Sequence, residues 1–167
     1  MIQKILLLGD PLLYKKSEPV EESELSYIAA TVTDLHDTLM DHRRRKGFGR
    51  GIAAPQIGVL KRLIYLYIDR PVLIINPELT FSSRDVIAIW DDCMSVPGLW
   101  VQVDRYMRCH LEYKDLNWKQ QSLSMEGTLA ELIQHEYDHL DGILMTMRAR
   151  DRFSFSMIKP PVMKSHV

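Results

Sequence analysis

The fold of this 167-residue chain is decided by the stretch Gln134-His135-Glu136-Tyr137-Asp138-His139. Apolar residues recur around it at helical spacing, at Ala130, Ile133, Tyr137 and Leu140. This period predicts a helix over 127–140. The following Asp141-Gly142 predicts where the helix ends, because glycine can adopt the left-handed conformation of a helix cap.

Two histidines four positions apart lie on one face of a helix, with their Cβ atoms about 5–6 Å apart. The imidazoles of His135 and His139 can therefore reach one metal ion. Glu136 follows the first histidine, and its carboxylate can approach a water molecule on the ion without binding the ion itself. Metal-assisted hydrolysis requires this arrangement. Short patterns of this kind also arise by chance, so a metal site depends on a third ligand.

The third ligand has several candidates. No glutamate occurs downstream of the motif, as a thermolysin-like protease would require, and Met145 stands where a metzincin-type protease has its third histidine. Asp151 lies in an arginine-rich stretch and is expected to be solvated. Cys93 lies just before Pro97-Gly98, whereas Cys109 lies in an alternating segment with no turn to present it. A thiolate with two imidazoles and an open fourth position is a known catalytic ligand set, which favours Cys93.

The composition is that of an ordinary globular protein. Hydrophobic residues make up 46% and charged residues 26%, and the formal net charge of −1 does not favour nucleic acid as a partner. The basic cluster 43–46 is interpreted as a solvated helix end. The length fits one compact domain over residues 1–150. A loosely ordered tail, 151–167, is expected to follow it, because this stretch contains Pro160-Pro161 and has no clear period.

The chain is expected to work in the cytoplasm without contacting a membrane. Its longest early apolar run, residues 5–8, is too short for a secretory signal or a membrane span, and no other stretch approaches about 20 apolar residues. The two cysteines, Cys93 and Cys109, have no paired spacing. This pattern fits a reducing compartment, where a cysteine is a ligand or a core residue rather than half of a disulfide.

The rest of the chain is predicted to contain one more helix and several strands. An apolar repeat over 23–45 predicts an amphipathic helix, which the glycines at 47, 49 and 51 then end. Asn76-Pro77 is expected to close the second strand, and Asp115-Leu116-Asn117 to form a hairpin turn between the last two. The β-type runs predict strands at 63–68, 72–75, 86–90, 101–107, 109–113 and 122–125.

Three blocks of sequence carry a resemblance to a known family. They are Gly49-Arg50-Gly51-Ile52-Ala53-Ala54-Pro55-Gln56, then Asp91-Asp92-Cys93-Met94-Ser95, and then residues 134–140. In this order they resemble the peptide deformylase family, whose blocks read Gly-x-Gly-hydrophobic-Ala-Ala-x-Gln, Glu-Gly-Cys-Leu-Ser and Gln-His-Glu-x-Asp-His-Leu. The resemblance implies an α+β fold. Antiparallel β-sheets would pack around a central C-terminal helix that bears the two histidines, with an N-terminal helix in addition.

The resemblance also implies a reaction. Members of the family remove the N-formyl group from peptides that begin with formyl-methionine, and they act on nascent chains, so the ribosome is a possible partner. One divalent metal ion is implied, most often Fe²⁺, with Zn²⁺ or Ni²⁺ also accommodated. Carried onto this chain, the metal ligands are Cys93, His135 and His139, and the acid/base is Glu136. The oxyanion donors are the Gln56 side-chain amide and the Met94 backbone N–H. The peptide contacts lie at Arg50, Gly51, Gly98 and Trp100.

The second block departs from the family pattern, because Asp91 replaces Glu, Asp92 replaces Gly and Met94 replaces Leu. Asp91 keeps the charge and is expected to contact Arg105. Asp92 adds a negative charge beside Cys93, and it faces either the site or solvent.

Two further departures concern the peptide path. Arg50 stands where a hydrophobic residue is usual, and Trp100 stands where arginine is frequent. These departures leave open an alternative to an ordinary deformylase. The chain would then be a deformylase-like protein that keeps the metal and the fold but has an altered substrate preference or little activity.

Overall fold

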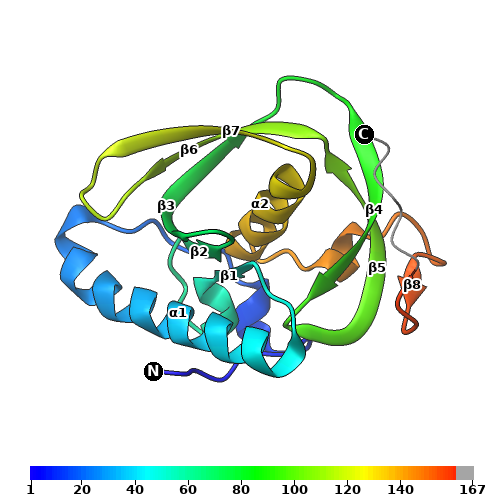
Figure 1. Cartoon of the computed structure of the whole chain (residues 1–167), viewed down its shortest axis with the longest axis horizontal. Coiled ribbons are helices and arrows are strands. Elements are labelled where there is room, and N and C mark those ends of the chain that lie inside the picture. Colours follow the sequence, from blue (N-terminus) through cyan, green and yellow to red (C-terminus); the bar gives the residue numbers. More distant parts are fainter. Residues whose placement is uncertain (161–167) are drawn as a thin grey trace.

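The central element of the computed structural model is helix α2, Gly127–Leu140, and two antiparallel sheets surround it (Figure 1). The structure describes residues 1–160. The second long helix, α1, spans Leu25–Lys46 and packs on the outer face of the larger sheet. This arrangement confirms the predicted α+β class, and α2 has the predicted bounds. Within the described residues, no helix combines the length and the apolarity needed to cross a bilayer.

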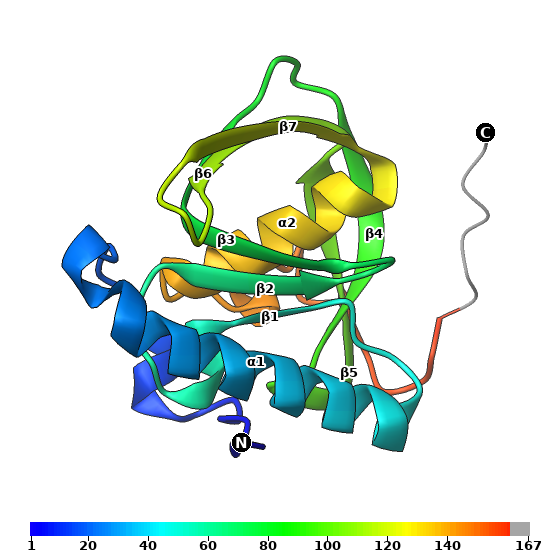
Figure 2. The ribbon, with the colours of Figure 1, turned by 60° about the vertical axis from the view of Figure 1, so that its left-hand side comes forward.

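The larger sheet has five strands in the order β1-β2-β3-β6-β7, and the smaller sheet has three in the order β4-β5-β8. Figures 1 and 2 show β6 and β7 arching over α2, while β4 and β5 stand beside it. The strands are β1 (Gly51–Ala53), β2 (Leu63–Tyr67), β3 (Pro71–Thr80), β4 (Val86–Cys93), β5 (Val96–Tyr106), β6 (Arg108–Lys114), β7 (Gln120–Glu126) and β8 (Phe155–Ser156), and the short 3₁₀ helices are η1 (Pro11–Tyr14), η2 (Glu22–Glu24), η3 (Ala54–Ile57) and η4 (Met145–Arg148).

Strand β2 is buried on both faces, which explains its uninterrupted apolar sequence. Ile64 and Leu66 pack in the core cluster that contains the apolar side of α2, whereas Leu63 and Tyr65 pack in the cluster that contains α1. Successive residues of a strand point to opposite faces of the sheet. One layer of sheet therefore positions both helices, with α2 above it and α1 below it in Figure 2.

The N-terminal strap, residues 5–17, ties together three segments that lie far apart in sequence. Beyond the end of α2, Gly142 has the predicted left-handed conformation (φ +71°), and a Cβ atom there would lie 2.5 Å from the carbonyl oxygen of Tyr14. Only glycine lets the strap approach so closely. Its backbone N–H groups donate to three carbonyl oxygens at 2.8 Å, from Leu6 to Gln56, from Leu8 to Ser95 and from Ser17 to Leu140.

The prediction that Asn76-Pro77 closes a strand was wrong, because β3 continues to Thr80. The pairing of β3 with β6 shifts register between Ile75 and Glu78, and Asn76 has a positive φ of 50°. An irregularity of this kind lets a proline lie inside a strand without breaking the sheet. The Asn76 side chain also bonds to both backbone polar groups of Val20, which compensates for the interrupted ladder.

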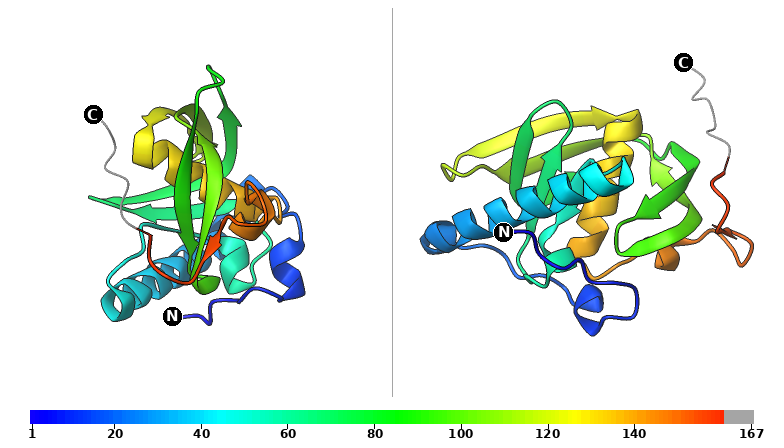
Figure 3. Two further views of the ribbon diagram at one scale, coloured as in Figure 1. Left: turned by 90° about the vertical axis from the view of Figure 1, so that its right-hand side faces the viewer. Right: turned by 60° about the horizontal axis from the view of Figure 1, so that its bottom comes forward.

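The tail prediction was wrong for the residues that directly follow Arg150. The carbonyl oxygen of Ser154 accepts a hydrogen bond from the Gln102 N–H at 2.8 Å, and β8 then pairs with Trp100 and Val101 of β5. Figure 3 shows this segment beside the β4–β5 hairpin. A strand of two residues has no period to reveal it, and the exposed edge of β5 supplies its partners. Residues 161–167 of the predicted tail lie outside the described residues.

Candidate metal centre

The middle of α2 carries many buried polar side chains. Burial of such groups is unfavourable unless each finds a partner. Gln134 finds its partner in β5, where it accepts a hydrogen bond from the Tyr106 N–H and donates to the Tyr106 carbonyl, both at 2.9 Å. The helix is thereby joined to the smaller sheet through side chains. The buried polar residues of α2 are Gln134, His135, Glu136, Asp138 and His139.

The two histidines and one cysteine meet beside the helix. The ring centroids of His135 and His139 are 5.0 Å apart. Cys93 is the last residue of β4, where a short turn leads into β5, and its Sγ lies 3.3 Å from Nε2 of His139. One donor atom from each of the three residues lies within 4.8 Å of the other two, and all three side chains are buried. The predicted ligands are therefore brought together.

This group fits a divalent metal ion by its donor chemistry. One sulfur and two imidazole nitrogens, each able to lie about 2.0–2.3 Å from an ion, form a three-ligand set that leaves a fourth position for a substrate or water. Burial, and then the neighbouring His135, lower the pKa of His139 well below its usual value, which keeps the imidazole in its neutral, ligating form. Glu136 Oε2 is buried and has no hydrogen-bond partner among the described residues. An unpartnered carboxylate oxygen beside three metal donors indicates that a further polar group belongs there.

Asp91 orients the first histidine. Its carboxylate accepts a hydrogen bond from Nδ1 of His135 at 2.9 Å, which leaves Nε2 of that ring for a metal. Asp91 also accepts from Arg105 at 3.0 Å, so the predicted contact is present. Burial alone would raise the pKa of Asp91, but the charges and hydrogen bonds of His135 and Arg105 lower it to about 2. The carboxylate is therefore an anion throughout the neutral range.

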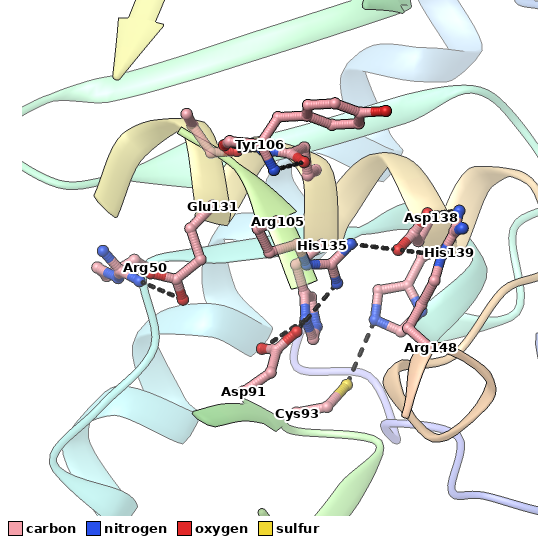
Figure 4. A network of polar contacts seen from close by, with 12 residues as sticks. Arg50, Asp91, Cys93, Arg105, Tyr106, Glu131, His135, Asp138, His139 and Arg148 are labelled. Atoms are coloured by element: carbon pink, nitrogen blue, oxygen red, sulfur yellow. Dashed lines mark hydrogen bonds and ion pairs between the residues drawn. The ribbon is translucent and has the colours of Figure 1, made fainter. Parts of the chain in front are cut away.

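A chain of ion pairs extends from Asp91 along the helix. Figure 4 shows Arg105 between Asp91 and Asp138, with Arg148 on the far side of Asp138. Arg105 Nη1 lies 2.5 Å from Asp138, and Arg148 Nη2 lies 2.7 Å from the same carboxylate. Arg105 is only 4% exposed, and its two acidic partners neutralise it. This chain fixes β4, β5 and η4 relative to α2, and hence fixes Cys93 relative to the histidines.

Gln56 is held with its amide nitrogen toward the cysteine. Its Oε1 accepts a hydrogen bond from the Ala53 N–H at 2.9 Å. Its Nε2 donates to Ser95 Oγ at 3.1 Å and lies 3.7 Å from Cys93 Sγ. Gln56 is only 1% exposed, so its hydrogen bonds within the protein fix the orientation of its side chain. Met94, the other predicted oxyanion donor, directly follows Cys93 in the turn between β4 and β5.

Gly51 leaves room for Glu136. A Cβ atom at position 51 would lie 2.7 Å from Glu136 Oε1 and 2.8 Å from Leu66 Cδ2. Its backbone conformation is an ordinary strand, so glycine is needed here for space and not for an unusual φ. Burial raises the pKa of Glu136 to about 7. A carboxyl group that titrates near neutrality can both accept and deliver a proton.

A cavity of about 820 Å³ opens above this group. All four residues predicted to contact a peptide line it, and so does Asp92. Asp92 therefore faces the cavity and not bulk solvent, and burial together with the nearby Asp91 raises its pKa. The tail contributes to the same wall, because Met157 and Lys159 also line the cavity. The predicted peptide contacts are Arg50, Gly51, Gly98 and Trp100.

Several residues of the site were not found from the sequence. Asp138 belongs to the helical motif, where its charge three positions after His135 was the available signal. Glu131 lies one turn before His135 and lines the cavity, and its spacing of four residues from that histidine was the available signal. Ser95, which bonds to Gln56, gave no signal beyond its place in the second block. The rejected ligand candidate Cys109 lies in the apolar core between the larger sheet and α2.

Comparisons with known proteins agree with the geometry. A sequence model of the family described as "Polypeptide deformylase" matches residues 2–154. "Peptide deformylase 1" of Prochlorococcus marinus is 37% identical over 166 residues, which cover 92% of this chain and 84% of the relative. A solved peptide deformylase from Synechococcus elongatus in complex with actinonin superposes with a TM-score of 0.82 at 32% identity, over 91% of this chain and 81% of that one. A class I type b peptide deformylase from Acinetobacter baumannii bound to Met-Ala-Ser superposes with a TM-score of 0.81 at 27% identity, over 89% and 98%.

Proposed function

Since the chain belongs to the polypeptide deformylase family, we propose that it hydrolyses the formyl amide of peptides that begin with formyl-methionine. The reaction adds water across the C–N bond and releases formate and a free α-amine. The observation that carries this proposal is the meeting of Cys93, His135 and His139 beside the unpartnered carboxylate oxygen of Glu136. The three ligands would hold one divalent ion, with Fe²⁺ preferred and Zn²⁺ or Ni²⁺ accommodated.

When bound, the ion supplies Lewis acidity, which polarises the formyl carbonyl and makes a water molecule more acidic. Residues of the chain transfer the proton and stabilise the developing negative charge. Glu136 takes a proton from the attacking water and delivers it to the departing amine nitrogen. The Gln56 amide, whose nitrogen already points toward Cys93, donates to the oxygen that gains negative charge, together with the Met94 backbone N–H.

The peptide is proposed to bind along β1. This strand is at the edge of the larger sheet, where one side of its backbone pairs with β2 and the other has no strand partner among residues 1–160. An extended peptide can join such an edge through main-chain hydrogen bonds. Arg50 and Gly51 lie at this edge, and Gly98 and Trp100 lie on β5 across the cavity.

Residues 1–150 are proposed to form the single catalytic domain, with β8 added to its edge. Cytoplasmic action on nascent chains at the ribosome is part of the same proposal. The two free, buried cysteines support a reducing location.

The proposal is tested with anaerobically purified protein. We expect about one metal ion per chain and turnover of formyl-Met-Ala-Ser. Glu136→Gln should keep the metal and lose turnover by about 10²-fold or more, as removal of a general acid/base does. Cys93→Ala should lose the metal, whereas Cys109→Ala, which changes a core thiol, should keep both metal and turnover.

A second candidate is a deformylase-like protein with little activity on ordinary substrates. It is favoured by one observation, namely that Asp92 adds a negative charge to the cavity beside Cys93. Metal-replete protein that turns over no formyl-methionyl peptide would select this candidate. Recovery of turnover in Asp92→Gly would then identify the cause.

A further inference from the structure

The cavity has a polar compartment beside His135, formed by Arg50, Asp92 and Glu131. Figure 4 shows the Glu131 carboxylate turned toward the guanidinium of Arg50. Arg50 Nη2 lies 3.8 Å from Glu131 Oε1, and Nη1 donates to the Thr128 carbonyl at 3.4 Å. The two side chains are 43% and 22% exposed, so a ligand in the cavity can contact both.

The distance from this compartment to the reacting bond follows from covalent geometry. A formyl carbon within reach of Glu136 lies about 2.4 Å from the first Cα atom of the peptide, because only the amide nitrogen separates them. Glu131 lies four residues before His135, which is about 6 Å along the axis of α2. An unbranched side chain of four or five heavy atoms spans about that distance. The first side chain of the peptide therefore reaches Glu131 when it extends along α2.

The peptide cannot extend in the opposite direction. Gln56 and Ser95 close the space behind Cys93, and each of them is at most 1% exposed. On the open side, Leu132 lines the cavity next to Glu131 and is 7% exposed. The compartment thus offers an apolar surface to the stem of a side chain and a charged pair to its end.

The ion pair of Arg50 and Glu131 determines which side-chain ends bind favourably in this compartment. A methionine side chain would displace water from Arg50 and Glu131 without replacing the hydrogen bonds. The amide of a glutamine can donate to Glu131 and accept from Arg50 at the same time. With Asp92 included, the compartment has one positive and two negative side chains, which disfavours binding of a first residue whose side chain ends in an anion.

We propose that Arg50 and Glu131 determine the specificity for the first residue, and that the protein accepts unbranched polar first residues, such as glutamine, nearly as well as methionine. This inference rests on the proposed deformylase function. It assigns to the pair a selective role and no part in the chemical step.

The test compares kcat/KM for formyl-Met-Ala-Ser and formyl-Gln-Ala-Ser in the metal-loaded full chain. For the wild type we expect a Met/Gln ratio below about tenfold. In the double variant Arg50→Leu/Glu131→Leu the ratio should rise by about tenfold or more, the range that a changed pocket contact produces. Both substrates are measured on one preparation, so the ratio does not depend on the folded or metal-loaded fraction.

The matched control is Arg150→Leu/Asp104→Leu. It removes another partly exposed pair, 3.0 Å apart and 44% and 47% exposed, that does not line the cavity. Its ratio should equal that of the wild type. A wild-type ratio above about a hundredfold, or an unchanged ratio in the Arg50/Glu131 variant, would overturn the inference. Absence of turnover for both peptides would instead refute the deformylase function on which it rests.

Discussion

Gly51 and Glu136 compete for the same space, and this yields a prediction for a single added methyl group. Gly51→Ala is expected to displace the Glu136 carboxylate and to cost about 1–3 kcal/mol of stability, as overpacking does. Turnover should fall while metal content stays. Chemical denaturation of the four proteins of a double-mutant cycle with Glu136→Ala measures the coupling. If Gly51→Ala costs as much in the Glu136→Ala background as alone, the cost comes from the approach to Leu66 and not from the approach to Glu136.

Cys109 gives a prediction on pH, because burial raises the pKa of its thiol to about 11 from an ordinary value of 9.0. The folded state holds this proton more tightly than the unfolded state. Its contribution to stability is therefore complete below pH 9 and is lost progressively as the pH rises toward 11. The free energy of unfolding, measured by urea titration between pH 8 and 10, should fall more steeply for the wild type than for Cys109→Ala. Parallel profiles would contradict this.

At the residue scale, the sequence predicted the three metal-donor side chains but not the polar side chains that orient them. His135 and His139 are one helical turn apart, and this spacing alone places both on one face. Cys93 was favoured by exclusion of the other ligand candidates and then by the resemblance, because nothing local relates a turn in one sheet to a helix more than forty positions later. Asp91 was expected to contact Arg105. Its bond to His135 depends on how β4 lies against α2, which no local pattern contains.

Among the elements, the contact between β5 and α2 depends on one buried cation. Arg105 lies between Asp91 and Asp138, so Arg105→Met would remove a cation shared by two buried carboxylates and leave His135 as the partner of Asp91 and Arg148 as that of Asp138. Loss of one member of such a group typically costs about 3–5 kcal/mol. Urea denaturation measures the change. Arg108→Met on the neighbouring strand removes a pair 3.7 Å apart and 65% and 80% exposed, so it should change stability very little.

Strand β8 yields a prediction about substrate binding. A chain shortened after Arg152 loses Met157 and Lys159 from the cavity wall, and Trp100 loses its strand partner Ser156. The KM for formyl-Met-Ala-Ser should rise several-fold with little change in kcat, because the groups beside the reacting bond stay in place. The matched control is a chain shortened after Pro160, which keeps β8, Met157 and Lys159. Equal KM values for the two shortened chains would show that β8 does not contribute.

The long elements were predictable and the short ones were not, for a physical reason. The helix over 127–140 has nearly four turns, enough for its period to appear in the sequence, and β2 is a run of five apolar residues. β1 and β8 have three and two residues, so their pairing depends on neighbouring strands and not on their own composition. The continuation of β3 past Pro77 depends on a register shift against β6, which is a tertiary contact.

For the molecule as a whole, a bound ion would connect the two sheets. Cys93 ends a strand of the smaller sheet, whereas the histidines lie on the helix packed against the larger one. Zn²⁺ at a free concentration of 100 times Kd should therefore stabilise the folded state by about 2.7 kcal/mol. Calorimetry should show a higher Tm with Zn²⁺ for the wild type and for Cys109→Ala, but not for Cys93→Ser. An equal shift in Cys93→Ser would place the ion elsewhere.

The N-terminal strap has a consequence for the order of events during biosynthesis. The strap donates its hydrogen bonds to Gln56, Ser95 and Leu140, and the last of these is translated more than a hundred residues after the strap. Contacts between such distant positions form slowly. A nascent polypeptide that does not yet contain His139 and Leu140 lacks one ligand and one acceptor of the strap, so we expect metal acquisition to follow the synthesis of α2.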